Sequence, residues 1–498
     1  MPGSGLDNAF TPSLRLVQQE ALILESSEIG EISDMVKSCL RCGKCKDVCT
    51  THVPEANLLY SPRDKIIGTN LISEAFLYEE QTRRGISLNH FDELNDIADH
   101  CTICHRCESP CPVDIDFGNV SIKMKNILYK NDKLERSVIS KLSMAYLNMS
   151  KPWKINITKR LLIDYGFKFQ NIASKLCRPY IKKQPNKTVG NPSFTTEIIT
   201  ILDKPLPKDT GLKPLRELLK INDVGNIPIL RNPQKTKPDS PSVFYFPGCG
   251  SERLFSQISL ATVALLFDQG IKIVLPPSYL CCGYPQTSAG LEKKGKEIST
   301  ENRVLFHRIA NTLNYLDIKH VITSCGTCID QLYTYELGDI FKECKLVDIH
   351  EYLLEKGVKL ESNQNKFLYH APCHDPIKST NSTKLVSEIM GTEVINSDRC
   401  CGEAGTFGVS RSDIAKQVKF KKEAQINNDL MKLIGKKKAK KGTKILTTCP
   451  SCRQGLSRYK SSTGVSPVYP IELIAEQRLG KKWQETLISN VNIEQVLL

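Results

Sequence analysis

The pattern of apolar and polar positions divides the chain into a helical first part and a later part in which strands and helices alternate. Over residues 1–177, segments of helical periodicity surround two dense cysteine runs, and residues 151–177 continue this pattern. Short apolar runs then occur at 243–246, 271–274, 320–324 and 366–370, with helical stretches near 251–269 and 292–315. This alternation predicts α/β organisation in the later part.

Prolines separate these two parts of the chain. They stand at positions 179, 185, 192, 205, 207, 214, 228, 233, 238 and 241, and so interrupt regular structure repeatedly. We therefore predict a linker over 178–241, with one short helix at 212–221. The remaining boundaries are a helical domain over 1–177, α/β domains over 242–360 and 365–478, and a C-terminal tail over 479–498.

The later part is an internal duplication. Three pairs of cysteines are each 124 residues apart, whereas Cys282 and Cys401 are 119 apart, so the second copy is five residues shorter in one loop. The three pairs are Cys249 with Cys373, Cys325 with Cys449, and Cys328 with Cys452. The predicted fold class is α+β and multidomain: a mainly helical domain for two ferredoxin-type clusters, followed by a duplicated α/β cysteine-rich domain.

Composition narrows the class of protein. The hydrophobic content of 40% and the charged content of 24% are ordinary for a soluble chain, and no apolar run is long enough to cross a membrane. The start has neither a basic region nor an apolar core of the kind that directs export, so we expect a cytoplasmic location. The formal charge of +14 comes from widely spread lysines and no nucleic-acid module accompanies them, so we expect no nucleic-acid partner.

Twenty cysteines in a chain of this kind indicate metal binding instead of disulfides. Two runs, CLRCGKCKDVC and CTICHRCESPCP, have the spacing C-x2-C-x2-C-x3-C, in which three cysteines hold one 4Fe-4S cluster and the fourth reaches another. We predict one cluster on Cys39, Cys42, Cys45 and Cys111, and a second on Cys101, Cys104, Cys107 and Cys49. A pair of zinc sites is the alternative, but it leaves the third cysteine of each run unexplained.

Each copy of the duplicated part adds five cysteines, arranged as a lone cysteine, a Cys-Cys-Gly and a Cys-x2-Cys. They follow apolar strands, whose carboxyl ends gather ligands in α/β folds. Adjacent cysteines suit neighbouring irons of one cluster, and glycine lets the backbone approach closely. The two predicted sets are Cys249, Cys281, Cys282, Cys325 and Cys328, and Cys373, Cys400, Cys401, Cys449 and Cys452. We expect Cys177 and Cys344, which lie outside every motif, to be packing residues.

Two histidines flank the cysteine of the motif YHAPCH. His370 and His374 are candidates for a hydrogen bond to a cluster sulfur or for a proton relay, with simple packing as the alternative. The chain shows no dinucleotide-binding glycine motif, no P-loop and nothing similar to a flavin domain. We therefore predict that it passes electrons, and we identify no residue that would oxidise an organic substrate.

These motifs resemble the iron–sulfur part of FAD-linked 2-hydroxyacid dehydrogenases of the glycolate oxidase and D-lactate dehydrogenase type. The segments that carry the resemblance are CLRCGKC, ADHCTICHRCESPCPVDIDFG, FPGCGSERLF, YLCCGYPQ, SCGTC, YHAPCH, CCGEAGTFG and CPSC. Related proteins are the iron–sulfur subunit of anaerobic glycerol-3-phosphate dehydrogenase and the D component of heterodisulfide reductase. The resemblance implies two 4Fe-4S clusters in the helical domain and a further cluster, of cubane or non-cubane type, in each cysteine-rich copy.

The resemblance also implies partners. An FAD-linked dehydrogenase subunit or domain would oxidise the 2-hydroxy acid, and a quinone or another acceptor would take the electrons. Through such partners the chain would contact the inner face of the membrane peripherally. The alternative function is a disulfide reductase of the heterodisulfide reductase type, in which the Cys-Cys-Gly clusters cleave a substrate disulfide.

Overall fold

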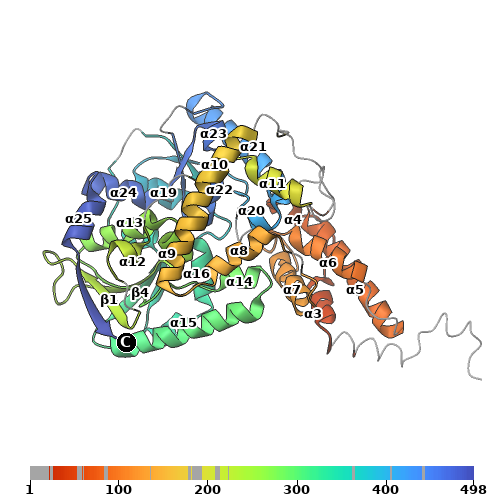
Figure 1. The fold of residues 1–498 in the computed structure, drawn as a ribbon, viewed down its shortest axis with the longest axis horizontal. Coiled ribbons are helices and arrows are strands. Elements are labelled where there is room, and N and C mark those ends of the chain that lie inside the picture. The colour runs from red at the N-terminus through yellow and green to blue at the C-terminus, as the bar shows by residue number, and fades with distance from the viewer. Residues whose placement is uncertain are drawn as a thin grey trace, which may run out of the picture. The chain divides into compact units, whose positions relative to one another are not determined.

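The computed structural model describes two compact units of the chain (Figure 1). Its described residues are 22, 26–52, 59, 61–82, 88–134, 136–177, 181, 193–207, 213–221, 224–361, 365–403, 407–439 and 443–498. The first unit comprises residues 1–136 with 186–192 and 288–292, and the second comprises 137–185, 193–287 and 293–498. Among the described residues, no helix is long and apolar enough to span a membrane.

The first unit is helical, as predicted. Its helices are α3 (Glu28–Val36), α4 (Cys45–Val48), α5 (Pro62–Thr82), α6 (Leu88–Asp99) and α7 (Phe117–Lys130). Side-chain caps fix two of the starts, because the Ser27 hydroxyl accepts the Gly30 N–H at 3.0 Å and the Asp116 carboxylate accepts the Gly118 N–H at 2.8 Å. An apolar core joins α3, α5, α6 and α7, and several of the ferredoxin-type cysteines pack at its edge.

The second unit contains two sheets of the same topology. The first copy orders its parallel strands β3 (Lys272–Val274), β2 (Ser242–Phe246), β4 (Ile318–Thr323) and β5 (Lys345–Asp348). The second copy orders β7 (Val394–Asn396), β6 (Phe367–His370), β8 (Lys444–Thr447) and β9 (Ser466–Val468) in the same way. In each copy the chain goes to one side of its first strand and then to the other, which opens a crevice at the carboxyl ends of the strands.

Helices connect the strands of both copies. Those of the first copy are η3 (Gly250–Leu254), α13 (Ser256–Asp268), α14 (Tyr284–Ser288), α15 (Glu292–Thr312), α16 (Gly326–Tyr333), α17 (Leu337–Ile340) and α18 (Ile349–Glu355). Those of the second copy are α19 (Ser382–Met390), α20 (Phe407–Ser410), α21 (Ser412–Ile434), α22 (Pro450–Ser457), α23 (Lys460–Thr463) and α24 (Pro470–Leu479). The predicted fold class is thus confirmed.

Several segments differ from the domain boundaries expected from the sequence. Residues 226–231 of the expected linker form β1 (Asn226–Arg231), and the expected tail forms α25 (Trp483–Asn490) and β10 (Asn492–Leu497). The strands β1 and β10 pair with each other antiparallel, and β1 also joins β3, so the first sheet has six strands. The linker region further contains α11 (Phe194–Leu202) and α12 (Leu215–Leu218), the latter within the expected short helix.

Residues 137–177 form helices that belong to the second unit instead of the helical first one. They are α8 (Val138–Leu147), α9 (Pro152–Thr158), the π-helical segment η1 (Lys159–Tyr165) and α10 (Gly166–Cys177). The last three follow one another without a break and form one long ribbon with α11 beside its end (Figure 1).

Candidate iron–sulfur sites

The two cysteine runs of the first unit adopt the same backbone conformation. In each run the residues on either side of the second cysteine, Cys42 or Cys104, have positive φ. They are Arg41 (55°), Gly43 (80°), Ile103 (52°) and His105 (56°). This conformation is costly for a β-branched residue such as Ile103, and such strain is typical of functional sites. The Ile103 N–H points back to the Cys101 sulfur at 3.3 Å, as expected for a loop that wraps around thiolates.

The structure gathers the eight ferredoxin-type cysteines around two small pockets. Residues lining one pocket include Cys39, Cys42, Cys45, Cys107 and Cys111. Residues lining the other include Cys49, Cys101, Cys104 and Cys107. The fourth cysteine of each run thus lies with the triplet of the other run, while Cys107 borders both pockets. The assignment of individual ligands to the two clusters remains our prediction.

Burial makes a thiol in the second of these pockets harder to ionise. It raises the pKa of Cys101 to about 11, against the charge of the nearby Lys65 ammonium, which lowers it. Lys65 is itself buried and donates to the Thr51 hydroxyl at 3.0 Å, which in turn lies 3.3 Å from the Cys49 sulfur. Sequence reasoning missed this buried cation, which would offset the negative charge of thiolates when metal replaces their protons.

The cysteines of the second unit follow the strands as predicted. In the first copy Cys249 and Cys325 come after β2 and β4, and in the second Cys373 and Cys449 come after β6 and β8. The glycine of each Cys-Cys-Gly has positive φ, with Gly283 at 91° and Gly402 at 75°. A side chain at Gly402 would come within 2.8 Å of Lys419, so the loop requires glycine both for conformation and for space.

These ten cysteines form one continuous series of side-chain contacts that crosses from one copy to the other. Cys281 and Cys249, at one end, have their sulfurs 4.0 Å apart. The copies meet where Cys325 contacts Cys449, which are corresponding residues of the duplication. In order, the series is Cys249, Cys281, Cys282, Cys328, Cys325, Cys449, Cys452, Cys401, Cys400 and Cys373. Both predicted five-cysteine sets are therefore brought together.

Hydrogen bonds between the thiols decide which of them ionises most readily. Hydrogen bonds with the thiols of Cys249 and Cys282 hold the pKa of Cys281 well below its ordinary value. The same bonds and then burial raise the pKa of Cys249 and of Cys282, although Cys328 partly offsets the latter. Buried sulfurs this close cannot all be charged without a cation among them, so the donor set fits a multi-iron cluster.

His370 lies against the second copy's cysteines. One of its ring nitrogens lies within 4.8 Å of the sulfurs of both Cys401 and Cys452, and these two sulfurs lie within the same distance of each other. All three residues are buried. The Lys422 ammonium lies 3.2 Å from His370 Nδ1 and donates to the carbonyls of Ser397 and Asp398 at 2.6 Å. The first copy has Phe246 in place of His370, since the two residues are 124 apart.

Lys422 distinguishes the copies, although nothing in the sequence singles it out. It is the eleventh residue of α21, and the eleventh residue of α15 is Asn302, which donates to the Cys281 carbonyl at 2.7 Å. Lys422 is fully buried, and burial lowers its pKa to about 8, against the charge of Asp429 and Cys401. Counted from the helix start, Lys422 thus stands at the position of α21 that Asn302 has in α15, and the two side chains bind different carbonyls.

His374 belongs to the second copy, but its ring binds side chains of the first copy. Its Nδ1 lies 2.6 Å from the Asp330 carboxylate on α16, and its Nε2 lies 3.1 Å from the Tyr284 hydroxyl, next to Gly283. The hydrogen bonds to His374 and Lys378, acting against burial, lower the pKa of Asp330. His374 therefore supports the loop of the first copy's Cys-Cys-Gly. The hydrogen bond to a cluster sulfur and the proton relay that the sequence suggested for it stay predictions.

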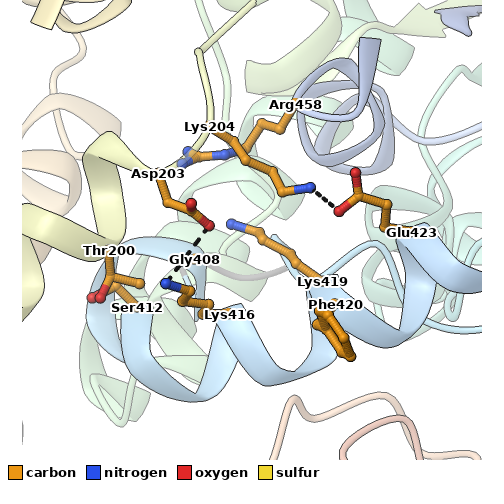
Figure 2. Close-up of a pocket in the computed structure, with 10 residues that line it drawn as sticks. All are labelled: Thr200, Asp203, Lys204, Gly408, Ser412, Lys416, Lys419, Phe420, Glu423 and Arg458. Atoms are coloured by element: carbon orange, nitrogen blue, oxygen red, sulfur yellow. Dashed lines mark hydrogen bonds and ion pairs between the residues drawn. The ribbon is translucent and has the colours of Figure 1, made fainter. Parts of the chain in front are cut away.

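An ion-pair network supports the second copy's Cys-Cys-Gly loop. The carboxylate of Glu403, next to Gly402, binds Lys419 at 2.5 Å and Arg458 at 3.5 Å. These two cations also line a pocket between α11 and α21, in which Lys204 pairs with Glu423 and Lys416 lies 3.9 Å from Asp203 (Figure 2). Because each of these cations has an acidic partner, we assign the pocket no anionic ligand.

The two cysteines outside the motifs lie away from these sites. Cys344 packs beside the core of the first copy, donates to the Leu337 carbonyl at 3.2 Å, and has its pKa raised to about 11 by burial. Cys177 is half-buried at the end of α10. Their expected packing role stays a prediction.

We expect anaerobically purified protein to contain iron and acid-labile sulfide in near-equal amounts, with less than one zinc per chain. The reason is that each group of converging thiols offers more sulfur donors than one tetrahedral zinc ion takes. Metal analysis with sulfide determination tests this. Stoichiometric zinc without iron, after expression with iron supplied, would contradict it.

Comparison with known proteins agrees with this reading. The family described as 4Fe-4S dicluster domain matches residues 24–115, and the cysteine-rich domain family matches residues 243–333 and 367–457. No solved structure gives a significant match.

Among curated relatives, the probable glycolate oxidase iron-sulfur subunit of Bacillus subtilis is 24% identical over 471 residues, covering 88% of this chain and 93% of that protein. The glycolate oxidase iron-sulfur subunit of Escherichia coli is 22% identical over 422 residues, covering 82% and 87%. Lactate utilization protein A of an Exiguobacterium strain is 26% identical over 201 residues, covering 36% of this chain and 78% of that protein. The chain is an iron–sulfur protein with one 4Fe-4S dicluster domain and two cysteine-rich domains, and it is a homologue of glycolate oxidase iron–sulfur subunits.

Proposed function

We propose that this chain carries electrons one at a time from an FAD-linked dehydrogenase, which oxidises a 2-hydroxy acid such as glycolate or D-lactate, to a quinone or another acceptor. The observation that carries the proposal is the gathering of eighteen cysteines into close groups, with ten of them in one continuous series. The printed names of the relatives, glycolate oxidase iron-sulfur subunit and lactate utilization protein A, support the class of substrate.

The chain's own residues would hold two 4Fe-4S clusters in the first unit and one further cluster in each cysteine-rich copy, with FAD on the partner. Bound clusters accept and release single electrons. The thiolates bind the metal, and the surrounding core excludes water from Cys282, Cys401 and their neighbours. The buried Lys422 ammonium, which contacts His370, sets the local charge in the second copy, and low dielectric strengthens its effect.

A disulfide reductase is the second candidate function. The observation that favours it is the contact between Cys325 and Cys449, because both cysteine sets would then act on one substrate at the junction of the copies. Electron transfer is the better supported function, since the relatives that cover most of this chain are named as subunits of an oxidase.

We expect the purified chain alone to oxidise neither glycolate nor lactate with an artificial dye as acceptor. Activity should appear when the flavoprotein captured with it from the native host is added, because no flavin-binding motif is present in the chain. Dye and quinone-analogue reduction should be followed in parallel under anaerobic conditions.

The control is the flavoprotein without the chain, which should reduce the dye but not the quinone analogue. Turnover by the pure, flavin-free chain would contradict the electron-transfer proposal. Reduction of a thiol-cofactor disulfide by the chain, without any hydroxy-acid activity in the reconstituted pair, would favour the second candidate.

A further inference from the structure

The long helix from α9 to α10 exposes a row of large apolar side chains and buries several polar ones, unlike an ordinary surface helix. Its inner face buries Lys159, Gln170, Asn171 and Ser174 in addition to apolar residues. Its outer face carries an outer stripe, defined as Trp153, Ile157, Leu161, Tyr165, Phe169 and Ile172, in which each residue is between 51% and 73% exposed. Soluble helices normally place the apolar face inward, so an exposed stripe of this size marks an interaction surface.

Specific contacts hold the inner face in place. The Gln170 amide donates to the carbonyls of Ile201 and Lys204 at 2.8 and 2.9 Å and accepts the Leu206 N–H at 2.9 Å. Further along, Ile155 and Ile163 belong to a small buried cluster. The helix therefore cannot turn its apolar side inward without breaking these contacts.

The π-helical segment η1 lies at the middle of the stripe and keeps it in line. The residues of the stripe are four apart from Trp153 to Phe169, a spacing that drifts around an α-helix of 3.6 residues per turn. The wider turns of a π-helix over Lys159–Tyr165 reduce this drift. A straight apolar line along one side of the helix is the result.

Cations flank the outer stripe. Lys151, Lys154, Arg160, Lys168 and Lys175 are all exposed, and Asp164 is the one acidic residue between 151 and 177. Two of the ammonium groups lie over aromatic rings of the stripe, Lys154 at 5.6 Å from Trp153 and Lys168 at 5.6 Å from Tyr165. The surface thus suits a partner with an apolar layer, which the outer stripe would enter, and negative charges above that layer, which the cations would bind.

We propose that the outer stripe inserts into the interface of an anionic lipid bilayer, so that the chain docks on a membrane surface through this helix. Helices that lie in the bilayer interface combine bulky apolar and aromatic residues with lysine and arginine, and aromatic rings of tryptophan and tyrosine gather at headgroup depth. A protein partner fits less well, because lysine is depleted in protein–protein interfaces. The proposal does not depend on the substrate or acceptor of the proposed function, although docking would bring the chain close to membrane quinones.

The test uses the anaerobically purified full chain and vesicles made of either neutral phosphatidylcholine or a mixture with phosphatidylglycerol. We expect cosedimentation with the anionic vesicles, weakening as salt is added, and at least a tenfold loss in the double variant Leu161→Glu with Phe169→Glu. Both positions are exposed, so the variant should fold. The matched control is Val304→Glu with Met431→Glu, two exposed apolar positions on other helices with the same change of charge.

Trp153 provides a second readout. The only other tryptophan, Trp483, is 6% exposed and packs in the core, so Trp483→Phe leaves the outer stripe as the source of tryptophan fluorescence. Emission of this variant should shift to shorter wavelength when anionic vesicles are added and should stay unchanged with neutral ones.

Three results would overturn the proposal: no binding to anionic vesicles, equal binding by the double variant and the wild type, or an unchanged Trp153 emission in the bound state. Loss of flavoprotein capture in the double variant, with vesicle binding intact, would instead assign the surface to a protein partner. Vesicle binding requires no turnover, so a failure here is separate from a failure of the electron-transfer proposal.

Discussion

Replacing Cys111 with serine should remove about half of the ferredoxin-type EPR signal from the reduced protein. Cys111 follows the second cysteine run in sequence, but it lines the pocket of Cys39, Cys42 and Cys45. A cluster that loses one of four thiolate ligands loses the binding free energy that holds its loop in place. The cluster predicted on the first run should therefore be lost, although the substituted residue lies in the second.

Cys401→Ser is the matched comparison, because it removes one buried thiol from the second unit. It should leave both first-unit signals at full intensity, since all eight ferredoxin-type cysteines lie in the other compact unit. Iron analysis of both variants should accompany spin quantitation. If the two substitutions removed the same signals to the same extent, the predicted sharing of ligands and the independence of the units would both be wrong.

Lys422→Asn should lower the reduction potential of the cluster predicted in the second copy by on the order of 100 mV. The substitution gives the second copy the residue that the first copy has at the same helix position, Asn302. A buried ammonium beside the cysteines stabilises the more negative, reduced cluster. A unit charge about 6 Å away contributes about 3 kcal/mol at an effective dielectric constant of about 20, and about 1.4 kcal/mol corresponds to 59 mV for one electron.

An anaerobic redox titration followed by EPR measures this potential. Lys432→Asn is the charge-matched control, because Lys432 is exposed on the same helix and its charge is screened by water. Lys422→Arg separates charge from the hydrogen bonds to Ser397 and Asp398, and it should keep the potential near the wild-type value. A potential shared by wild type and Lys422→Asn would exclude an electrostatic role for this residue.

Short-range spacing explains how much of the site could be predicted. The cysteine runs and the repeated Cys-Cys-Gly are local patterns whose chemistry needs little tertiary information, and the structure gathers these residues into groups. Lys422 could not be selected from the sequence, because it lies among Lys416, Lys419 and Lys421 in a lysine-rich helix. Only the packing of α21 against β6 determines which of these lysines is buried beside His370.

Long-range pairing explains what was missed in the fold. The strand β1 contains Pro228 and lies in a proline-rich stretch, so its sequence favours a linker over a strand. Its partner β10 lies more than 250 residues away, and pairs of that separation leave no periodic signal. Similarly, the periodicity of residues 151–177 predicts an amphipathic helix but does not say that the bulky apolar side faces outward.

The junction of the two cysteine-rich copies has the arrangement of a symmetric homodimer whose subunits have been joined into one chain. Cys325 meets its own counterpart, Cys449, and the close approach of Gly250 to Pro450 is repeated by that of His374 to Gly326. Such reciprocal contacts define an isologous interface. A free dimer must keep both halves identical, whereas a fused one lets each half change alone. Fusion therefore allows His370 and Lys422 in one half with Phe246 and Asn302 in the other, and so two unlike surroundings for the cysteines on one symmetric scaffold.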